Sequence, residues 1–399
     1  MSATIEGSPA RDRRPENREE PARRHRVARH PMTTSLPREL RSARLRALAV
    51  LTDRLGDVTP ARTALDAALA APPRGADDWE PDAILARAWE VAGLERPPGR
   101  VPADDTAPVL RLLATCAHRS LPEAARIALV LSAAAGLSTD DIGHVFAAPE
   151  PVMAQRIAWA EMRVRPSLGE PIAEEDVSAQ LGRVLDVLML IFDDGVVHPH
   201  APVDLPWEAV ETTRVLIELF HGEQEPRALL ALMLLTRARR DARQESDGTL
   251  RALEVQDRDL WHHAEIEEGL FLLRGSQRKG RTGPYQVRAS IQAAHVTAHE
   301  ASDTDWPRLL TLYDRLMELA PSDAVALGRA CAVAEVTGPE AALESVERMG
   351  VDTHLFHATR AELLRRMGRA EEADRAWTAA VARARSASEH QRLRGEVER

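Results

Sequence analysis

The sequence is poor in several kinds of residue, and each shortage excludes a class of protein. The 399 residues include two cysteines, Cys116 and Cys331, a single lysine, Lys279, and only 4% aromatic residues. Two cysteines cannot form a disulfide framework, and they fit the reducing cytoplasm. Aromatic and β-branched residues favour strands, so their scarcity argues against a large sheet. No apolar run is long enough for a membrane-spanning helix, so none is predicted.

The abundant residues are arginine, alanine, leucine and glutamate, which are good helix formers. The sequence therefore predicts an all-α protein, and its bias is typical of a GC-rich bacterial genome. The length predicts two or three domains. Lysine and arginine together number 52 against 62 aspartates and glutamates, which gives a net charge of −10. This charge argues against a protein whose whole surface binds nucleic acid.

The chain divides into five segments. Residues 1–36 are rich in arginine, glutamate and proline and predict a disordered basic tail, either a solvated extension or an arm that contacts DNA or polymerase. Residues 37–96 predict short helices, and four prolines mark residues 97–108 as a linker. Residues 109–168 predict a compact helical unit. Residues 181–399 predict a succession of helices with short turns.

The clearest local pattern begins at Pro122. This residue opens a helix whose apolar residues recur with helical spacing and which is expected to end at Gly136. Ser138 and Asp141 have the spacing of a capping box, so they predict the start of a short second helix. A tight break and a longer third helix follow. This succession predicts a helix-turn-helix, and an ordinary helical bundle could produce the same pattern.

The third helix of this pattern is the one expected to enter the major groove of DNA. Its candidate DNA-binding residues are Ala154, Gln155, Arg156, Trp159, Arg163 and Arg165. Its residues expected to face inward are Met153, Ile157, Ala160 and Val164. Glu150 and Glu161 are expected to offset part of the arginine charge, which would weaken binding to phosphate groups.

A second pattern lies between residues 358 and 384. Small residues and one large aromatic recur there at Ala361, Leu364, Gly368, Ala373, Trp377 and Ala380. This is typical of tetratricopeptide-like helix pairs, in which small residues let the helices approach. One such pair cannot bury its apolar face alone, so we expect it to stack on residues 305–350. Both a stabilising appendage and a concave surface for a protein or a small ligand fit this pattern.

Residues 109–165 resemble the fourth region of bacterial extracytoplasmic-function sigma factors. The resemblance is carried by the stretches LRLLATCAHRSLPEAARIALVL and GLSTDDIGHVFAAPEPVMAQRI. The stretches VLDVLMLIFDDG, ALLALMLLTRARRDAR and RAELLRRMGRAEEADRAW extend it toward residue 390 and resemble the subgroup with a C-terminal tetratricopeptide-like helical extension. The resemblance implies a transcription initiation protein that binds core RNA polymerase and promoter DNA. It implies a regulatory C-terminal domain, no catalysis and no cofactor.

The chain also departs from this family. Residues 37–96 stand where the family has its second region, which binds polymerase and melts promoter DNA. The part around Trp79 and Trp89 is acidic where the family is basic, and Asp193-Asp194-Gly195-Val196 replaces the family's Asn-Glu-Gly-Tyr. The chain is therefore identified as a divergent or degenerate member. The alternative is a sigma-derived protein that has lost promoter melting and serves as a binding or scaffold protein.

A third hypothesis is a recruited enzyme or ligand-binding protein with a pocket between the sigma-like part and the repeats. Its candidate residues are His262, His263, His295 and Asp194. His295 and His299 are spaced to share one helix face and could supply half of a metal site. No Walker, GxGxxG or HExxH motif and no cysteine pair accompanies them. We therefore expect structural or surface roles for these histidines.

Overall fold

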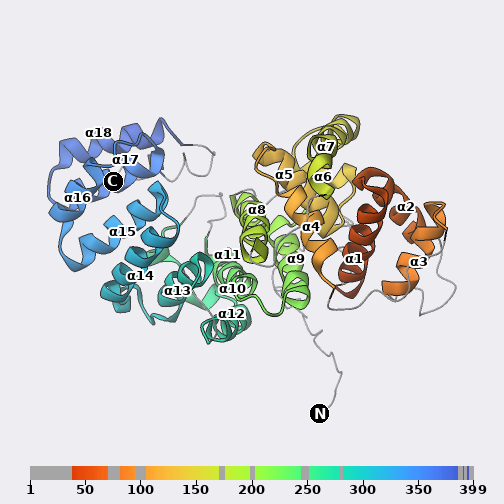
Figure 1. Ribbon diagram of the computed structural model, residues 1–399. Coiled ribbons are helices and arrows are strands. Elements are labelled where there is room, and N and C mark those ends of the chain that lie inside the picture. The colour runs from red at the N-terminus through yellow and green to blue at the C-terminus, as the bar shows by residue number, and fades with distance from the viewer. Residues whose placement is uncertain are drawn as a thin grey trace, which may run out of the picture. The chain divides into compact units, whose positions relative to one another are not determined.

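The computed structural model describes residues 38–70, 81–95, 105–169, 176–197, 203–243, 251–278, 282–384, 390 and 393–394 (Figure 1). Within these ranges every regular element is a helix and no strand occurs, which confirms the predicted all-α class. None of the described helices combines the length and the apolar character needed to cross a membrane. The predicted basic tail 1–36, most of the predicted linker 97–108, Trp79 and Lys279 lie outside the described residues.

The first three helices pack as one group, in which each contacts the other two. The apolar stripe of Leu45, Leu48 and Leu51 on the first helix is buried. This helix ends at Gly56, whose φ of 65° favours a residue without a Cβ. The bounds are Arg38–Leu55 for α1, Val58–Ala70 for α2 and Pro81–Val91 for α3. They confirm the short helices predicted within residues 37–96.

The next group contains the predicted three-helix pattern. Pro122 precedes the helix that it was expected to open, and Gly136, with a φ of 76°, ends it. The last turn of this helix widens into a π-helix, η2. The bounds are Ala107–Cys116 for α4, Glu123–Val130 for α5, Leu131–Ala135 for η2, Thr139–Val145 for α6, Glu150–Val164 for α7 and Arg165–Gly169 for the 3-10 helix η3.

The central group is built around one helix that is apolar on all sides. Every residue from Ala228 to Leu235 in this helix, α10, is buried, because α9, α12 and α13 all pack against it. At Gly269 in α12 an added Cβ would lie 2.9 Å from Leu235 Cγ, so the glycine permits this close approach. The bounds are Val177–Val197 for α8, Leu205–Leu219 for α9, Glu225–Arg237 for α10, Arg240–Arg243 for α11, His263–Ser276 for α12 and Pro284–Thr297 for α13, with 3-10 turns η5 (Leu253–Val255) and η6 (Arg258–Leu260) before α12.

The last helices pack in chain order, each against the next. Their apolar core runs without a break from Leu327 and Val346 to Ala361 and Trp377. The predicted stacking of residues 358–384 on the preceding helices is thereby confirmed. The bounds are Trp306–Leu319 for α14, Asp323–Val336 for α15, Pro339–Glu347 for α16, His354–Arg366 for α17 and Ala370–Val381 for α18, with a 3-10 turn η7 (Ala301–Asp303) before α14.

Two buried arginines of α1 bind the carbonyl oxygens of η2. Arg44 donates hydrogen bonds to the carbonyl oxygens of Ser132 at 3.3 Å and Ala133 at 3.2 Å. Arg41 donates to the carbonyl oxygen of Ala135 at 3.1 Å. The last carbonyl groups of a helix have no partner within the helix, and a buried one must be satisfied from elsewhere. These side chains therefore both satisfy the end of η2 and hold α1 against it.

Arg41 also reaches a third part of the chain. Its Nη1 lies 2.6 Å from Glu208 Oε2 in α9, and both side chains are almost fully buried. Since neither charge is hydrated at this depth, each depends on the other for compensation. The pair joins the first helix group to the central group.

Candidate functional site

The turn between α6 and α7 sets the position of α7. Asp141 donates its backbone N–H to Ser138 Oγ at 3.1 Å, and the Asp141 carboxylate accepts the backbone N–H of Ser138 at 3.1 Å. The predicted capping box is thus confirmed. A Cβ added at Gly143 would lie 2.7 Å from the carbonyl oxygen of Ala148. The turn can close this tightly because residue 143 has no side chain.

Helix α7 has one buried and one exposed face. The four residues predicted to face inward are buried, namely Met153, Ile157, Ala160 and Val164. The six candidate DNA-binding residues are all exposed, five on α7 and one at the start of η3: Ala154, Gln155, Arg156, Trp159, Arg163 and Arg165. The chain therefore presents the candidate residues on the surface, where a macromolecule can reach them.

The three arginines of this surface differ in their surroundings. Arg165 Nη1 forms an ion pair with Asp57 at 3.1 Å. Arg156 and Arg163 have no ion pair or hydrogen bond through their side chains to the residues that the structure describes. They are seven residues apart, so they lie on the same side of the helix. Two guanidinium groups of α7 are thus available to an anionic partner.

Two large apolar side chains share this exposed face. Trp159 is 50% exposed and Met162 is 68% exposed. Burying the apolar side chains of tryptophan and methionine is favourable, so their joint exposure marks a surface able to make apolar contacts with a partner. The outer face of α7 therefore combines free cations with an apolar patch.

The interpretation of Glu161 as a charge that offsets these arginines is wrong. Its side chain is only 3% exposed, because it extends from α7 to Arg62 in α2. Its carboxylate pairs with Arg62 at 2.5 Å and accepts a hydrogen bond from the hydroxyl of Thr59 at 2.5 Å. The spacing already contained this signal, since residue 161 follows Ile157 by four and precedes Val164 by three, on the inward face.

The predicted histidine candidates do not assemble into a site. His295 in α13 packs its ring edge-on against Trp306, with 5.9 Å between ring centroids. Desolvation lowers the pKa of His295 to about 4, and the guanidinium groups of Arg239 and Arg258 act in the same direction. Such positive surroundings oppose the binding of a cation.

The remaining candidates have separate environments. His262 Nε2 lies 2.8 Å from Asp241 Oδ2, while His263 and His299 are exposed. Within the described ranges, no three His, Cys, Asp or Glu side chains are arranged to hold a metal ion. The Cys116 thiol is buried, and this burial raises its pKa to about 12, so it is a poor nucleophile at neutral pH.

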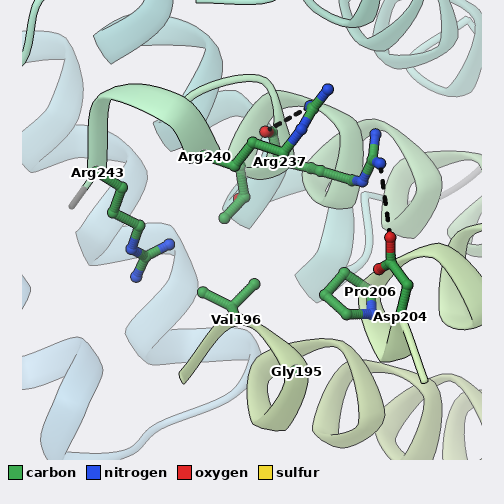
Figure 2. Close-up of a pocket in the computed structure, with 8 residues that line it drawn as sticks. Gly195, Val196, Asp204, Pro206, Arg237, Arg240 and Arg243 are labelled. Carbon is green, nitrogen blue, oxygen red and sulfur yellow. Dashed lines mark hydrogen bonds and ion pairs between the residues drawn. The ribbon is translucent and has the colours of Figure 1, made fainter. Parts of the chain in front are cut away.

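A pocket of about 190 Å³ opens in the central helix group (Figure 2). It lies where the end of α8 and the start of α9 meet the end of α10 and α11. Its lining includes Gly195, Val196, Pro206, Arg237, Arg240 and Arg243. The sequence did not predict this pocket, although arginines at every third residue from 237 to 243 indicate one charged helix face. None of the residues expected to line an enzyme pocket, His262, His263, His295 and Asp194, contributes to its lining.

Comparison with known proteins places the chain in a family. Residues 180–277 match the model of a family of unknown function, DUF6596. The chain is 38% identical over 300 residues to an uncharacterized protein of Rhizobium meliloti (strain 1021). The aligned residues make up 73% of this chain and 71% of that protein. This chain belongs to the same family as that protein. The DUF6596 match begins in α8 and ends just after α12, so it contains the whole pocket and no part of α7. No solved structure matches the chain.

Proposed function

We propose that this chain is a sigma-factor-like transcription initiation protein that binds core RNA polymerase and contacts promoter DNA through α7. The observation that carries the proposal is an exposed arginine face on a helix held by a capped, glycine-dependent turn. A helix that follows a shorter helix after a tight turn is the arrangement expected of a major-groove reader, so this observation supports the proposal. The resemblance of residues 109–165 to the fourth region of extracytoplasmic-function sigma factors supports the same function.

The charge on α7 suits a protein that reads DNA as part of a larger complex. Each phosphate neutralised by a protein cation contributes about 0.9 to the slope of log K against log salt. Arg156, Arg163 and Arg165 would therefore supply a slope of about 2 to 3, which is small for an independent DNA-binding protein. Bound to polymerase, the same contacts would need only to orient the complex on the upstream promoter element.

The C-terminal helices are proposed to form a tetratricopeptide-like regulatory domain. The packing of α14 to α18 in chain order supports this assignment, because helical repeats contact mainly their neighbours. The small residues Ala361, Ala373 and Ala380 at the α17–α18 contact support it too. Such a domain would add a contact to polymerase or hold a protein or small-ligand partner.

Co-purification with bacterial core RNA polymerase and run-off transcription test the proposal. We expect the full chain to be retained by core polymerase and to direct transcription from a cognate promoter. The double variant Arg156→Gln/Arg163→Gln should lower the salt slope of DNA binding by about 2. The matched control Arg348→Gln/Arg375→Gln removes two exposed arginines from the C-terminal helices and should leave the slope unchanged. A chain that neither binds polymerase nor supports transcription would contradict the proposal.

A second candidate function is a sigma-derived binding or scaffold protein that has lost promoter melting. The exposed Trp159 and Met162 favour it, since an apolar patch on α7 suits a protein partner better than a phosphate backbone. The salt dependence of DNA binding separates the two candidates. A promoter-reading chain would bind DNA at low salt and lose affinity with a slope of about 2 to 3, whereas the scaffold protein would show almost no DNA binding even at low salt.

A further inference from the structure

One side of the pocket in Figure 2 is apolar and fixed in shape. Val196 at the end of α8 and Pro206 at the start of α9 form this side. A Cβ added at Gly195 would lie 2.2 Å from Pro206 Cδ and 2.7 Å from Leu205 Cβ. The two helices therefore meet this closely because residue 195 is glycine. The apolar side is a property of the packed helices and does not depend on a mobile side chain.

The opposite side carries two arginines that are held in place by one carboxylate. Glu265 in α12 pairs through Oε1 with Arg237 and, at 2.8 Å, through Oε2 with Arg240. The guanidinium of Arg237 also lies over the ring of Trp207, 5.2 Å from its centroid. A guanidinium has five N–H donors, so these contacts orient both arginines and leave donors free.

Arg243 differs from its two neighbours. Its side chain makes no hydrogen bond or ion pair with the described part of the chain. Figure 2 shows it reaching into the pocket toward Val196. Desolvation lowers the pKa of Arg243, with Asp193 acting in the opposite direction. A partly buried guanidinium without a bonded partner is costly, and an anion placed against it would remove that cost.

The nearby carboxylate of Asp193 does not fully compensate Arg243. Desolvation raises the pKa of Asp193 to about 6, although its side chain still reaches water, and both Arg243 and Arg288 act to lower this pKa. Among the described residues, neither a hydrogen bond nor an ion pair joins this carboxylate to Arg243. Asp204, a further acid of the lining, lies toward Arg237, with 4.0 Å between Oδ2 and Nη2. The Arg243 end of the pocket is therefore the end that attracts an anion.

We propose that this pocket binds a small organic oxyanion, with the charged group on Arg243 and the carbon body against Val196 and Pro206. Carboxylate and phosphate groups both match the donor geometry of arginine. A cavity of about 150 Å³ holds a molecule of the size of benzene, so a pocket of about 190 Å³ admits only a small ligand. This site is separate from the exposed face of α7 and does not require the chain to bind DNA.

Isothermal titration calorimetry on the full chain tests the proposal with three anions and one neutral probe. The anions are acetate, butyrate and inorganic phosphate, and the neutral probe is butyramide. We expect millimolar or tighter binding of an anion and none of butyramide. Butyrate binding more tightly than acetate and phosphate identifies a carboxylate with an apolar body, and phosphate binding most tightly identifies a phosphate-bearing ligand. Absence of binding by all three anions overturns the proposal.

Two variants locate the binding. Arg243→Gln should weaken anion binding at least tenfold, and Val196→Phe should weaken it comparably by filling the apolar side without changing charge. Arg348→Gln, on the exposed surface of the C-terminal helices, should bind as the wild-type chain does. Circular dichroism checks that each variant is folded, and the Val196→Phe result decides alone if Arg243→Gln does not fold. Wild-type affinity in a folded Arg243→Gln or Val196→Phe protein would overturn the proposal.

Discussion

Because Glu161 is buried, its negative charge does not lie on the exposed face of α7. Its buried carboxylate holds Arg62 at 2.5 Å and so joins α7 to α2. The variant Glu161→Gln would leave Arg62 without a counter-charge in a mostly buried position. We expect a loss of about 2–4 kcal/mol in the free energy of unfolding, near the lower end of the range for broken buried pairs because Arg62 keeps some exposure. Urea denaturation followed by circular dichroism measures this loss.

The exposed Glu150 on the same helix provides the control. Glu150→Gln should change the free energy of unfolding by less than about 0.5 kcal/mol, as surface substitutions usually do. If Glu150→Gln and Glu161→Gln were equally destabilising, the role of the Glu161–Arg62 pair would be refuted.

His295 makes stability depend on pH. Its pKa is lowered from 6.5 to about 4 in the folded chain, so the unfolded chain takes up a proton first as the pH falls. The folded state with a neutral His295 therefore has its full stability above pH 6.5, and it loses stability progressively as the pH falls from 6.5 to 4. We expect the loss to be on the order of 1–3 kcal/mol, since the ring is only partly buried. Urea denaturation at pH 7.5, 6 and 4.5 measures it.

A variant at the same helix end tests the assignment of this pH dependence. His295→Gln cannot titrate and should flatten the stability profile between pH 6.5 and 4. His299→Gln, at an exposed position, should keep the wild-type profile. An unchanged profile in His295→Gln would assign the pH dependence to other groups.

Single residues differ in how far the sequence predicts their roles. The cap formed by Ser138 and Asp141 was predicted because its partners are three residues apart. The role of Glu161 was not predicted, because its partner Arg62 is 99 residues away in the chain. The same holds for Arg243, which becomes part of a pocket only when α8 and α9 are brought beside it. Local spacing thus identifies caps and buried faces, whereas ion pairs and pockets depend on the packing of distant helices.

At the scale of helices, the α6–α7 geometry depends on Gly143. The variant Gly143→Ala places a Cβ 2.7 Å from the carbonyl oxygen of Ala148, so the turn must open. We expect a loss of about 1–3 kcal/mol in the free energy of unfolding, as for other overpacked sites. DNA binding through α7 should weaken as well, because the helix changes its angle. Denaturation and a DNA-binding titration measure the two effects.

Gly182 in α8 supplies the matched control, because a Cβ added there meets nothing within 4 Å. Gly182→Ala should stabilise the chain by about 0.5–1 kcal/mol, since alanine favours helix. A Gly143→Ala protein as stable as Gly182→Ala would show that the turn has room for a side chain and does not require glycine.

Helix α13 connects two apolar cores. Tyr285 and Ala289 contribute to the core of the central group, while Val287 and Ile291 contribute to the core that α14 and α15 share. A helix with two buried faces cannot leave its neighbours without exposing apolar surface on one side. This explains why the sequence predicted residues 181–399 only as one succession of helices, without a boundary between these two cores.

At the scale of the whole chain, composition predicted the fold class and little of the arrangement. The abundance of helix formers and the scarcity of strand formers were sufficient for the all-α prediction. The assembly of the helix groups depends on contacts such as Arg44 with Ser132, which are 88 residues apart. No periodic pattern in α1 indicates that its arginines are buried, since arginine usually occupies the surface.

The Arg41–Glu208 pair offers the strongest test of how the helix groups are joined. Arg41→Met leaves Glu208 buried without its counter-charge, and we expect a loss of about 3–5 kcal/mol in the free energy of unfolding. In Arg41→Met/Glu208→Met both buried charges are gone, so most of the lost stability should be regained. The contribution of the hydrogen bond from Arg41 to the carbonyl oxygen of Ala135 remains lost. A double-mutant cycle by urea denaturation measures the coupling. Additive effects of the two substitutions would mean that the charges do not interact, and α1 would then be held to α9 by other contacts, such as the ion pair between Arg38 and Glu211.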